Sequence, residues 1–446
     1  MTSAQQVALG GGATADLFLL RYGKDGSLLS VKAEEEIRSR LSASTDVFLF
    51  SHGWNNIFQK ALDRYRGFIV GYSGQREAFG VPGQPGYQPL LIGVIWPSTS
   101  FVFPWEAGPA IAAAPDPDGR EAAEAEEMLR LVMESLPASK QPEFVEGIDG
   151  RTTVGREDAL KLAELALTSL RPLDSDDGSR RPEVSEFLDK IWAKLDAGEE
   201  AVRDDADDEI GLVEDTDDDA VGIAGGFSFD PRNLLRVATV WKMKARAGDI
   251  GVHGVAPLLR HILSQDGPRL HLIGHSFGAR VLLSGLATAE PTRKAHSMLL
   301  LQPAVNRWCF AANVAGTGRK GGYHAVPDLV ERPLLTTMSE HDAPLRKFFH
   351  LAMRGGHLGE PDLAAFGNTD LYGALGGYGP YDEGDGRTAR QTATSPGENL
   401  YDLDSGARVI GVDGSLDVDG RPAIPSHGDI SSPATWWALH CLTRPN

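Results

Sequence analysis

Cysteine is scarce in this chain, and its scarcity limits both disulfide and metal chemistry. Only Cys309 and Cys441 occur among 446 residues, so neither a disulfide framework nor a four-thiolate zinc site can form. A single bridge between the two thiols is left open by the sequence. No metal site is expected.

Long apolar runs and a signal peptide are also lacking. No stretch reaches about 18 uninterrupted apolar residues, and the polar, Gly- and Ala-rich start at residues 1–14 has neither the basic nor the apolar segment of a signal sequence. We therefore expect a soluble, cytoplasmic protein without integral membrane association, although unconventional export would leave no such signal. The oligomeric state cannot be predicted.

Basic residues are outnumbered by acidic ones. Lys and Arg total 43 against 62 Asp and Glu, which gives a net charge of −19 and repels phosphate backbones and anionic lipid head groups. Nucleic acid is therefore not an expected partner. Eleven of the acids lie in residues 200–219 with one base, Arg203. That run does not show the pattern of a calcium loop, which combines a turn glycine with a regular spacing of ligands, so we expect a solvated acidic loop rather than a cation site.

Apolar runs typical of buried strands alternate with helical patterns through much of the chain, which predicts a mostly parallel sheet with helices on both faces. Strands are expected at residues 46–50, 89–96, 269–274, 297–302 and 332–337, with a first hairpin formed by 16–22 and 27–32 and a last strand at 399–404.

Residues 107–233 interrupt this alternation. Helical patterns at 120–136, 156–170 and 182–195 replace the strands there, separated by polar linkers. We expect a core in two parts, residues 1–106 and 234–446, divided by a helical and acidic insertion that serves as a cap or as a partner-binding element.

The strongest local motif is Gly274-His-Ser-Phe-Gly278, between a predicted strand and a helical pattern at 277–287. The five residues alone prove little, but a serine at a sharp strand-to-helix turn needs small neighbours two positions before and after it. Such a turn would expose the Ser276 hydroxyl and aim the amide of Phe277 at a developing oxyanion. We therefore predict Ser276 as a nucleophile rather than as a small structural residue.

A serine nucleophile needs a base, and the base needs a carboxylate partner. Asp342 follows the strand predicted at 332–337, at the sheet edge where active sites of open parallel sheets lie. Glu340 is the alternative, and a carboxylate here could also merely cap the next helix.

The base is expected to be a histidine after Asp342. His427 lies in a loop between the last predicted strand and a helix, which favours it over the other three. His350 falls in a helical run, and His440 adjoins two tryptophans; the remaining candidate is His357.

The second half of an oxyanion hole is expected after an early buried strand, where Ser51-His-Gly-Trp54 follows residues 46–50. Gly53 allows a close backbone approach, and its own amide or that of Trp54 can point inward; the alternative is a plain tight turn. His52 is expected to be a structural hydrogen-bonding residue.

Aromatic residues are frequent in the loops expected around the pocket, and we predict Trp54, Phe103 and Trp308 as substrate-binding residues. An apolar lining suits an acyl chain or an aryl group better than a sugar, so a small-molecule ester or lipid-like substrate is expected. The alternative is that part of this set is core.

Taken in order, His52-Gly53-Trp54, Gly274 to Gly278, Asp342 and His427 resemble the α/β-hydrolase superfamily, especially its bacterial lipase- and esterase-like serine hydrolases. In that family the nucleophile, acid and histidine occur in this chain order, and the amide after the nucleophile pairs with one from the first loop.

The resemblance covers residues 16–106 and 234–440. It implies an α/β-hydrolase fold, a catalytic triad of Ser276, Asp342 and His427, and ester hydrolysis through an acyl-enzyme without a cofactor. Because family members often place a cap elsewhere, it does not assign a role to residues 107–233. Two alternatives stay open: an amidase, thioesterase or phospholipase on the same triad, and a non-catalytic binding protein with a hydrolase fold.

Overall fold

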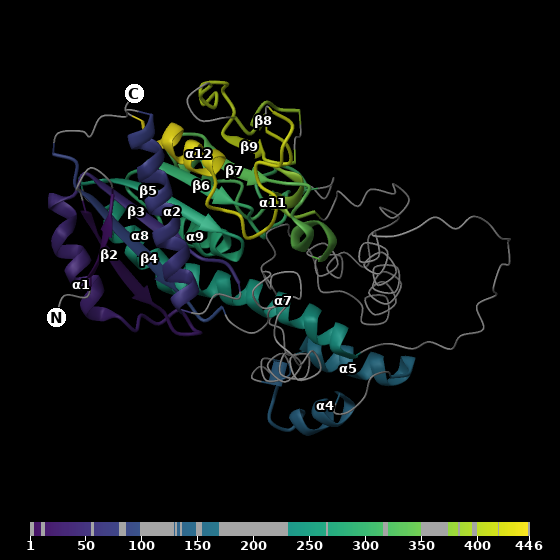
Figure 1. Cartoon of the computed structure of the whole chain (residues 1–446). Helices are drawn as coiled ribbons and strands as arrows, with labels where there is room; N and C mark the ends of the chain where they lie inside the picture. Colours follow the sequence, from purple (N-terminus) through teal and green to yellow (C-terminus); the bar gives the residue numbers. More distant parts are fainter. Residues whose placement is uncertain are drawn as a thin grey trace, which may run out of the picture.

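A mostly parallel sheet forms the centre of the protein, with helices on both faces (Figure 1). The computed structural model describes residues 4–9, 14–54, 58–79, 86–98, 129, 132–133, 136–148, 154–168, 231–264, 266–314, 320–348, 373–381, 384–394, 399–417 and 419–444. Within these residues the sheet has nine strands in the order β1-β2-β4-β3-β5-β6-β7-β9-β8. The α/β class expected from the sequence is therefore confirmed.

The sheet begins with one antiparallel pair, β1 (Ala4–Ala8) and β2 (Thr14–Arg21). The other pairs among the described strands are parallel. The remaining strands are β3 (Asp46–Ser51), β4 (Pro89–Ile95), β5 (Arg269–His275), β6 (Ser297–Leu301), β7 (Leu334–Met338), β8 (Thr388–Thr392) and β9 (Val409–Asp413). Strands β3, β6 and β7 are buried along their whole length, because both sheet faces are covered.

Helices α2 (Phe58–Ala78) and α12 (Pro433–Thr443) cover one face, and their buried side chains share an apolar cluster with that face. The opposite face is covered by four further helices. These are α1 (Val31–Arg40), α7 (Pro231–Asp249), α8 (Ala256–Leu263) and α9 (Phe277–Ala289). A π-helical segment, η3 (Ile250–Val255), joins α7 to α8.

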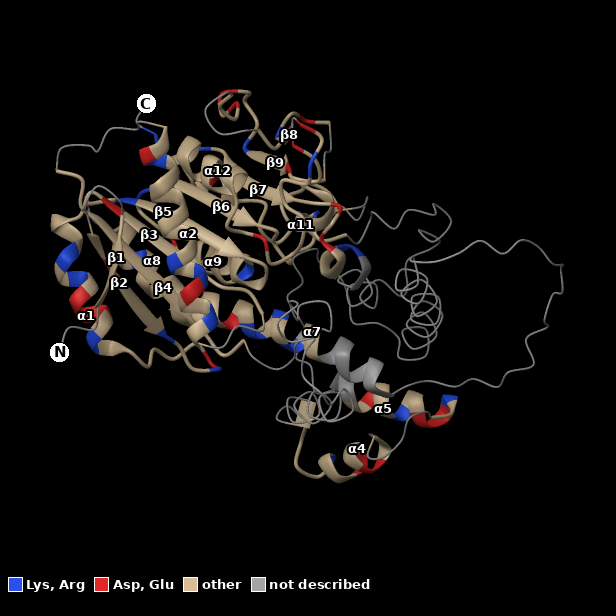
Figure 2. Cartoon of the chain, in the orientation of Figure 1, with Lys and Arg blue, Asp and Glu red and all other residues tan. Residues whose placement is uncertain are grey.

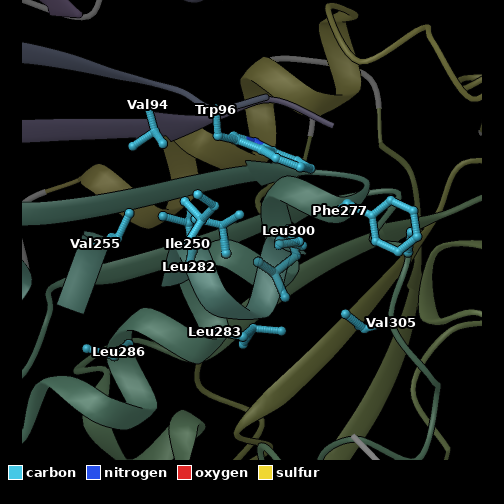
Figure 3. Close-up of a cluster of buried hydrophobic side chains, with 14 of the residues drawn as sticks. Val94, Trp96, Ile250, Val255, Phe277, Leu282, Leu283, Leu286, Leu300 and Val305 are labelled. Carbon is cyan, nitrogen blue, oxygen red and sulfur yellow. The ribbon is translucent and has the colours of Figure 1, made fainter. Parts of the chain in front are cut away.

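Helix α9 lies at the centre of the larger apolar cluster. Its Phe277, Leu282, Leu283 and Leu286 lie among side chains from the strands and from η3 (Figure 3). Because α9 is enclosed by the sheet on one side and by α7, η3 and α8 on the other, it is apolar on nearly every face. The residue that precedes α9 is therefore held on a rigid support.

Charged side chains lie mainly on the peripheral helices and loops, while the central strands are largely free of them (Figure 2). No helix among the described residues is both long and apolar enough to cross a bilayer. The shorter elements are η1 (Leu41–Ala43), α4 (Gln141–Ile148), α5 (Arg156–Thr168), η5 (Val326–Leu329), η6 (Pro344–Phe348) and α11 (Leu375–Tyr378).

The described part of residues 107–233 is helical, and α5 agrees with the helix expected at 156–170. Phe144 of α4, Leu162 of α5 and Met243 of α7 belong to one buried cluster. Helix α5 packs onto α7, and α4 packs onto α5. The helix expected at 182–195, most of the one at 120–136 and the acidic run at 200–219 lie outside the described residues.

Two strand predictions were wrong. Residues 27–32 do not form a hairpin strand with β2: β1 is the antiparallel partner, only one bridge joins Tyr22 to Leu28, and α1 begins at Val31. The reason is that Ala33 and Ile37, one helical turn apart, are the residues that reach the core.

Residues 399–404 are not a strand either. Tyr401 is buried and Leu400 is 47% exposed, but residues 399–404 form no backbone ladder with a neighbouring strand. The sheet ends instead in β9 and the edge strand β8, whose polar sequence carries little apolar signal.

Candidate active site

Ser276 lies at the sharp turn between β5 and α9. Its φ of 55° and ψ of −125° are unusual for a residue other than glycine and store backbone strain of roughly 1–3 kcal/mol. A Cβ at Gly274 would lie 2.7 Å from the Ala279 Cα, and one at Gly278 would overlap the Ser51 carbonyl oxygen. The glycine spacing in the motif therefore serves close packing of this turn.

Ser276, His427 and Asp342 form one hydrogen-bonded chain. The distance from His427 Nε2 to Ser276 Oγ is 3.0 Å, and that from His427 Nδ1 to Asp342 Oδ2 is 2.8 Å. Since a carboxylate only accepts hydrogen bonds, Nδ1 carries the proton, and Nε2 is left to accept from the serine hydroxyl. All three residues are buried, Asp342 completely.

Three strands bring these residues together at the carboxyl edge of the sheet. Ser276 follows β5, Asp342 follows β7 and His427 lies in the segment between β9 and α12. Asp342 also accepts a hydrogen bond from the Leu345 amide through Oδ1 at 3.0 Å. The capping role considered for this carboxylate therefore coexists with its contact to His427.

The competing candidates lie elsewhere. Glu340 is largely exposed, and its carboxylate is 3.8 Å from His341. His440 is buried on α12, where its ring stacks on Trp437 with centroids 4.7 Å apart. His350 and His357 lie outside the described residues.

The residues predicted for the oxyanion hole lie beside Ser276. A Cβ built on Gly53 would be 2.6 Å from the Ser276 Cβ, so the backbone after β3 runs directly against the serine. The Trp54 and Phe277 rings are 6.1 Å apart. Phe277 is the first residue of α9, where a backbone amide has no acceptor within the helix.

His52 is a structural residue in this loop. Its Nδ1 is 2.8 Å from the Gly53 carbonyl oxygen, and its Nε2 accepts from the Trp96 amide at 3.3 Å. Burial lowers the pKa of His52 to about 4, so the ring is neutral with its proton on Nδ1. It thereby fixes the Gly53–Trp54 peptide, whose amide points away from its carbonyl.

Three residues near the triad were missed by sequence reasoning. Gln302, directly after β6, donates a hydrogen bond to Asp342. The ring of His275 is hydrogen-bonded to the backbone carbonyl of His427, and Arg64 contacts the other ring nitrogen of His275. His275 stands inside the predicted motif, and Gln302 ends a predicted strand, so position at the sheet edge was an available signal. Arg64 lies within α2, away from the strand ends, and has no such signal.

The predicted aromatic lining is only partly described. Trp54 is half-buried next to Phe277, whereas Phe103 lies outside the described residues. Trp308 is buried in a small cluster with Ala311 and Val314 and stacks on Tyr381 with centroids 3.4 Å apart.

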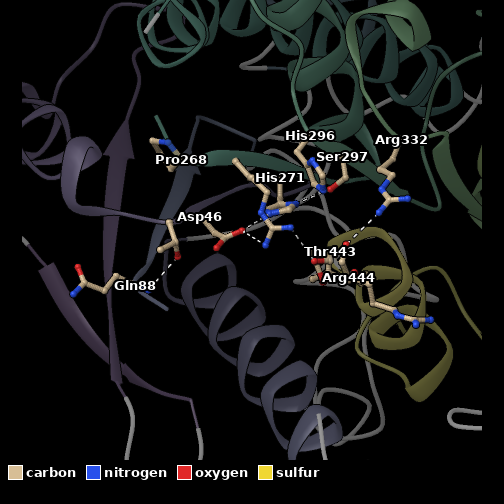
Figure 4. A network of polar contacts seen from close by, with 12 residues as sticks. Asp46, Gln88, Pro268, His271, His296, Ser297, Arg332, Thr443 and Arg444 are labelled. Atoms are coloured by element: carbon tan, nitrogen blue, oxygen red, sulfur yellow. Dashed lines mark hydrogen bonds and ion pairs between the residues drawn. The ribbon is translucent and has the colours of Figure 1, made fainter. Parts of the chain in front are cut away.

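A second Ser–His–Asp set is formed by Ser297, His271 and Asp46 (Figure 4). These residues lie at or near the amino ends of β6, β5 and β3, at the edge of the sheet opposite to the candidate site. His271 Nε2 is 3.0 Å from Asp46 Oδ1, and its Nδ1 is 2.8 Å from Ser297 Oγ. The exposed fractions are 0% for His271 and 1% for Asp46 and Ser297. A substrate has no access to a serine enclosed in this way, so the set is structural.

Burial lowers the pKa of His271 to about 4, so the ring is neutral. The Arg269 guanidinium also binds Asp46, at 2.7 Å. Hydrogen bonds from His271 and Thr45 outweigh burial at this carboxyl and lower the pKa of Asp46.

Among the described residues, no group of three or more His, Cys, Asp or Glu side chains is placed to hold a metal ion. Cys309 and Cys441 are buried free thiols and do not form the bridge left open by the sequence. Burial raises the pKa of the Cys441 thiol to about 11.

This chain matches no known protein-family model, no curated protein and no solved structure.

Proposed function

We propose that this protein is a serine hydrolase that cleaves a carboxylic ester through an acyl-enzyme on Ser276. The observation that carries the proposal is the chain of hydrogen bonds from Ser276 Oγ through His427 to Asp342, with the serine on a strained strand-to-helix turn. This combination of a nucleophile, a base and an orienting carboxylate is the one that acyl transfer requires.

We also assign the sheet to the α/β-hydrolase fold. The assignment is supported by the strand order with one antiparallel strand pair at the start and by the nucleophile turn after β5. The acid after β7 and the histidine after β9 follow in the order expected of that family.

In the acylation step, Ser276 Oγ attacks the ester carbonyl carbon while His427 Nε2 takes its proton. Asp342 holds the ring in the tautomer with Nδ1 protonated and stabilises the imidazolium. His427 then protonates the leaving alcohol as the carbon–oxygen bond breaks. Water, deprotonated by the same nitrogen, releases the acid from the acyl-enzyme and returns the proton to Ser276.

The tetrahedral oxyanion would be stabilised by backbone amides of the Gly53–Trp54 segment and of Phe277. Gly53 is in contact range of the nucleophile, and His52 fixes the adjoining peptide. Amides held in place before the reaction stabilise charge without reorganising. The Trp54 and Phe277 rings beside the serine favour an acyl or aryl group in the substrate.

The test combines a fluorophosphonate probe, read by intact mass, with hydrolysis of p-nitrophenyl esters from acetate to palmitate. Wild type is compared with Ser276→Ala and with the matched control Ser297→Ala, which alters the serine of the buried Asp46–His271–Ser297 set. We expect single labelling and ester turnover in wild type and Ser297→Ala, and neither in Ser276→Ala.

Parallel amide, thioester and phospholipid substrates decide whether the triad prefers another leaving group. A folded wild type that neither labels nor turns over any of these substrates would contradict the proposal and favour a ligand-binding role for the same fold.

A further inference from the structure

The Gln302 side chain links the acid and the base of the candidate triad. Its Nε2 donates to Asp342 Oδ2 at 3.2 Å and to the Ser426 carbonyl oxygen at 2.7 Å. Ser426 directly precedes His427. One amide group therefore joins the loop after β7 to the segment that carries the imidazole.

The chemistry of the two partners fixes the orientation of this amide. A carboxylate and a carbonyl only accept hydrogen bonds, so the NH2 group of Gln302 must face them. The Oε1 atom, on the other side, is buried and has no hydrogen-bond partner among the described residues. An unsatisfied buried oxygen lowers the stability of the folded protein, and the fold tolerates this loss at Gln302.

The backbone of Gln302 is also strained, with a φ of 42°. The backbone N–H of Gln302 donates a hydrogen bond to Thr337 Oγ1 at 2.9 Å. Gly376 packs against the Gln302 backbone so closely that a Cβ built on Gly376 would lie 2.6 Å from the Gln302 Cα. Gln302 follows β6 as Ser276 follows the neighbouring β5. Two of the three non-glycine residues with positive φ in the described chain thus lie at adjacent strand ends in the site.

We propose that Gln302 is a positioning residue for the reaction, which holds Asp342 and the His427 segment in register and withdraws negative charge from Asp342 Oδ2. The inference rests on the proposed hydrolase function. Strain and an unsatisfied oxygen both persist where the surrounding structure holds a residue for a function, and here the function is to keep Oδ2 aligned with His427 Nδ1.

The charge on Asp342 Oδ2 controls how readily His427 takes a proton. Four titratable or charged groups surround His427. Asp342 is hydrogen-bonded to its ring, and the ring of His275 on β5 lies next to it. Arg64 of α2 contacts His275, and Asp429 accepts a hydrogen bond from the hydroxyl of Ser426. Removing the Gln302 donor leaves more charge on Oδ2, which favours the imidazolium. In a plot of kcat/KM against pH, the acidic limb, where activity falls as His427 becomes protonated, then moves to higher pH.

The experiment compares wild type with Gln302→Met, which keeps the length of the side chain but has no donor. Thr336→Val is the control, since it changes a buried polar residue on β7 whose side chain points away from Thr337. Ester hydrolysis is followed from about pH 5 to about pH 9. For Gln302→Met we expect kcat/KM to fall about 10- to 100-fold and the acidic limb to rise by about one pH unit.

A second measurement needs no turnover. In the Ser276→Ala background, the low-field NMR resonance of the His427 Nδ1 proton should move in Gln302→Met and stay in place in Thr336→Val. If Gln302→Met does not fold, Gln302→Asn keeps a buried amide but shortens it by one methylene, and we expect changes in the same direction.

A Gln302→Met protein with wild-type kcat/KM, acidic limb and low-field resonance would overturn the inference. So would an equal displacement of the limb in Thr336→Val, because the effect would then be general loosening. A wild type that does not react with the fluorophosphonate probe refutes the hydrolase function instead, and the resonance alone then decides whether Gln302 controls the Asp342–His427 contact.

Discussion

The Nε2–H of His275 donates a hydrogen bond to the backbone carbonyl of His427 over 3.0 Å. Arg64 Nη1 lies 3.3 Å from the other ring nitrogen of His275. Burial, followed by the nearby charges of His427 and Arg64, keeps the pKa of His275 well below its ordinary value. A neutral ring on the strand that carries Ser276 therefore anchors the backbone of the proposed base.

His275→Phe tests this anchor. The substitution keeps an aromatic ring but removes the donor, so the His427 segment loses its tie to β5. We expect kcat/KM for the ester to fall about 10- to 100-fold, the range seen for small misplacements of reacting groups. Unchanged kinetics in a folded variant would show that the segment is positioned without His275.

Gly53→Ala tests the close approach of the loop after β3. The new Cβ would lie 2.6 Å from the Ser276 Cβ and 3.1 Å from His275 Nδ1, so the loop must retreat and its amides leave the oxyanion position. We expect kcat to fall by about 10²–10³. The control is Gly74→Ala in α2, where a Cβ meets no atom within 4 Å; it should retain activity and gain up to about 1 kcal/mol in stability.

Asp342→Asn tests the orienting carboxylate. Asp342 accepts hydrogen bonds from His427 and Gln302 through Oδ2 and from the Leu345 amide through Oδ1. In the asparagine variant the side-chain NH2 group takes the place of one of these oxygens, so in either orientation it faces N–H donors and cannot accept from them. We expect kcat to fall by about 10⁴. The control is Glu340→Gln, at the exposed carboxylate two residues earlier. Comparable losses in both variants would refute the assignment of Asp342.

Acid stability tests the buried Asp46–His271–Ser297 set. The pKa of His271 is about 4 in the folded protein against 6.5 for an ordinary histidine. Between these values the unfolded chain binds a proton at this residue that the folded protein does not bind. The stabilising contribution is therefore complete above about pH 6.5 and is lost as the pH falls toward about 4.

Urea unfolding of wild type and His271→Gln over this pH window measures the effect. The slope of unfolding free energy against pH should be lower in His271→Gln by up to about 1.4 kcal/mol per pH unit. Buried His52, with a pKa also of about 4, retains its own contribution in both proteins. Parallel curves for wild type and His271→Gln would contradict this prediction, because they would show that His271 binds protons equally in the folded and unfolded states. As a control, the curve of Thr336→Val, which removes no titrating group, should run parallel to that of wild type.

Much of the central sheet could be predicted from local patterns. The continuous apolar runs of β3 and β5 identify strands covered on both faces. The glycines around Ser276 identify a turn that no larger residue could make. These features depend on residues only a few positions apart in the chain, so they can be recognised directly from the sequence.

The sheet edges could not be predicted in the same way. The short, polar β8 becomes a strand because β9 offers a partner for its backbone, and β1 takes the place predicted for residues 27–32 beside β2. Edge strands face solvent in part, so their side chains lack the apolar signal that marks the centre.

The sequence by itself determined that a serine would stand on a tight turn between a buried strand and a helix, followed in order by an acid and a histidine. Only the tertiary structure decided that Gln302 links Asp342 to the His427 segment, and that Ser276 meets His427 across 151 residues of sequence. It also decided that Ser297, His271 and Asp46, three residues of the same types, are enclosed at the opposite edge. Strand order and burial make that difference, because they set which distant loops meet and which side chains a substrate can reach.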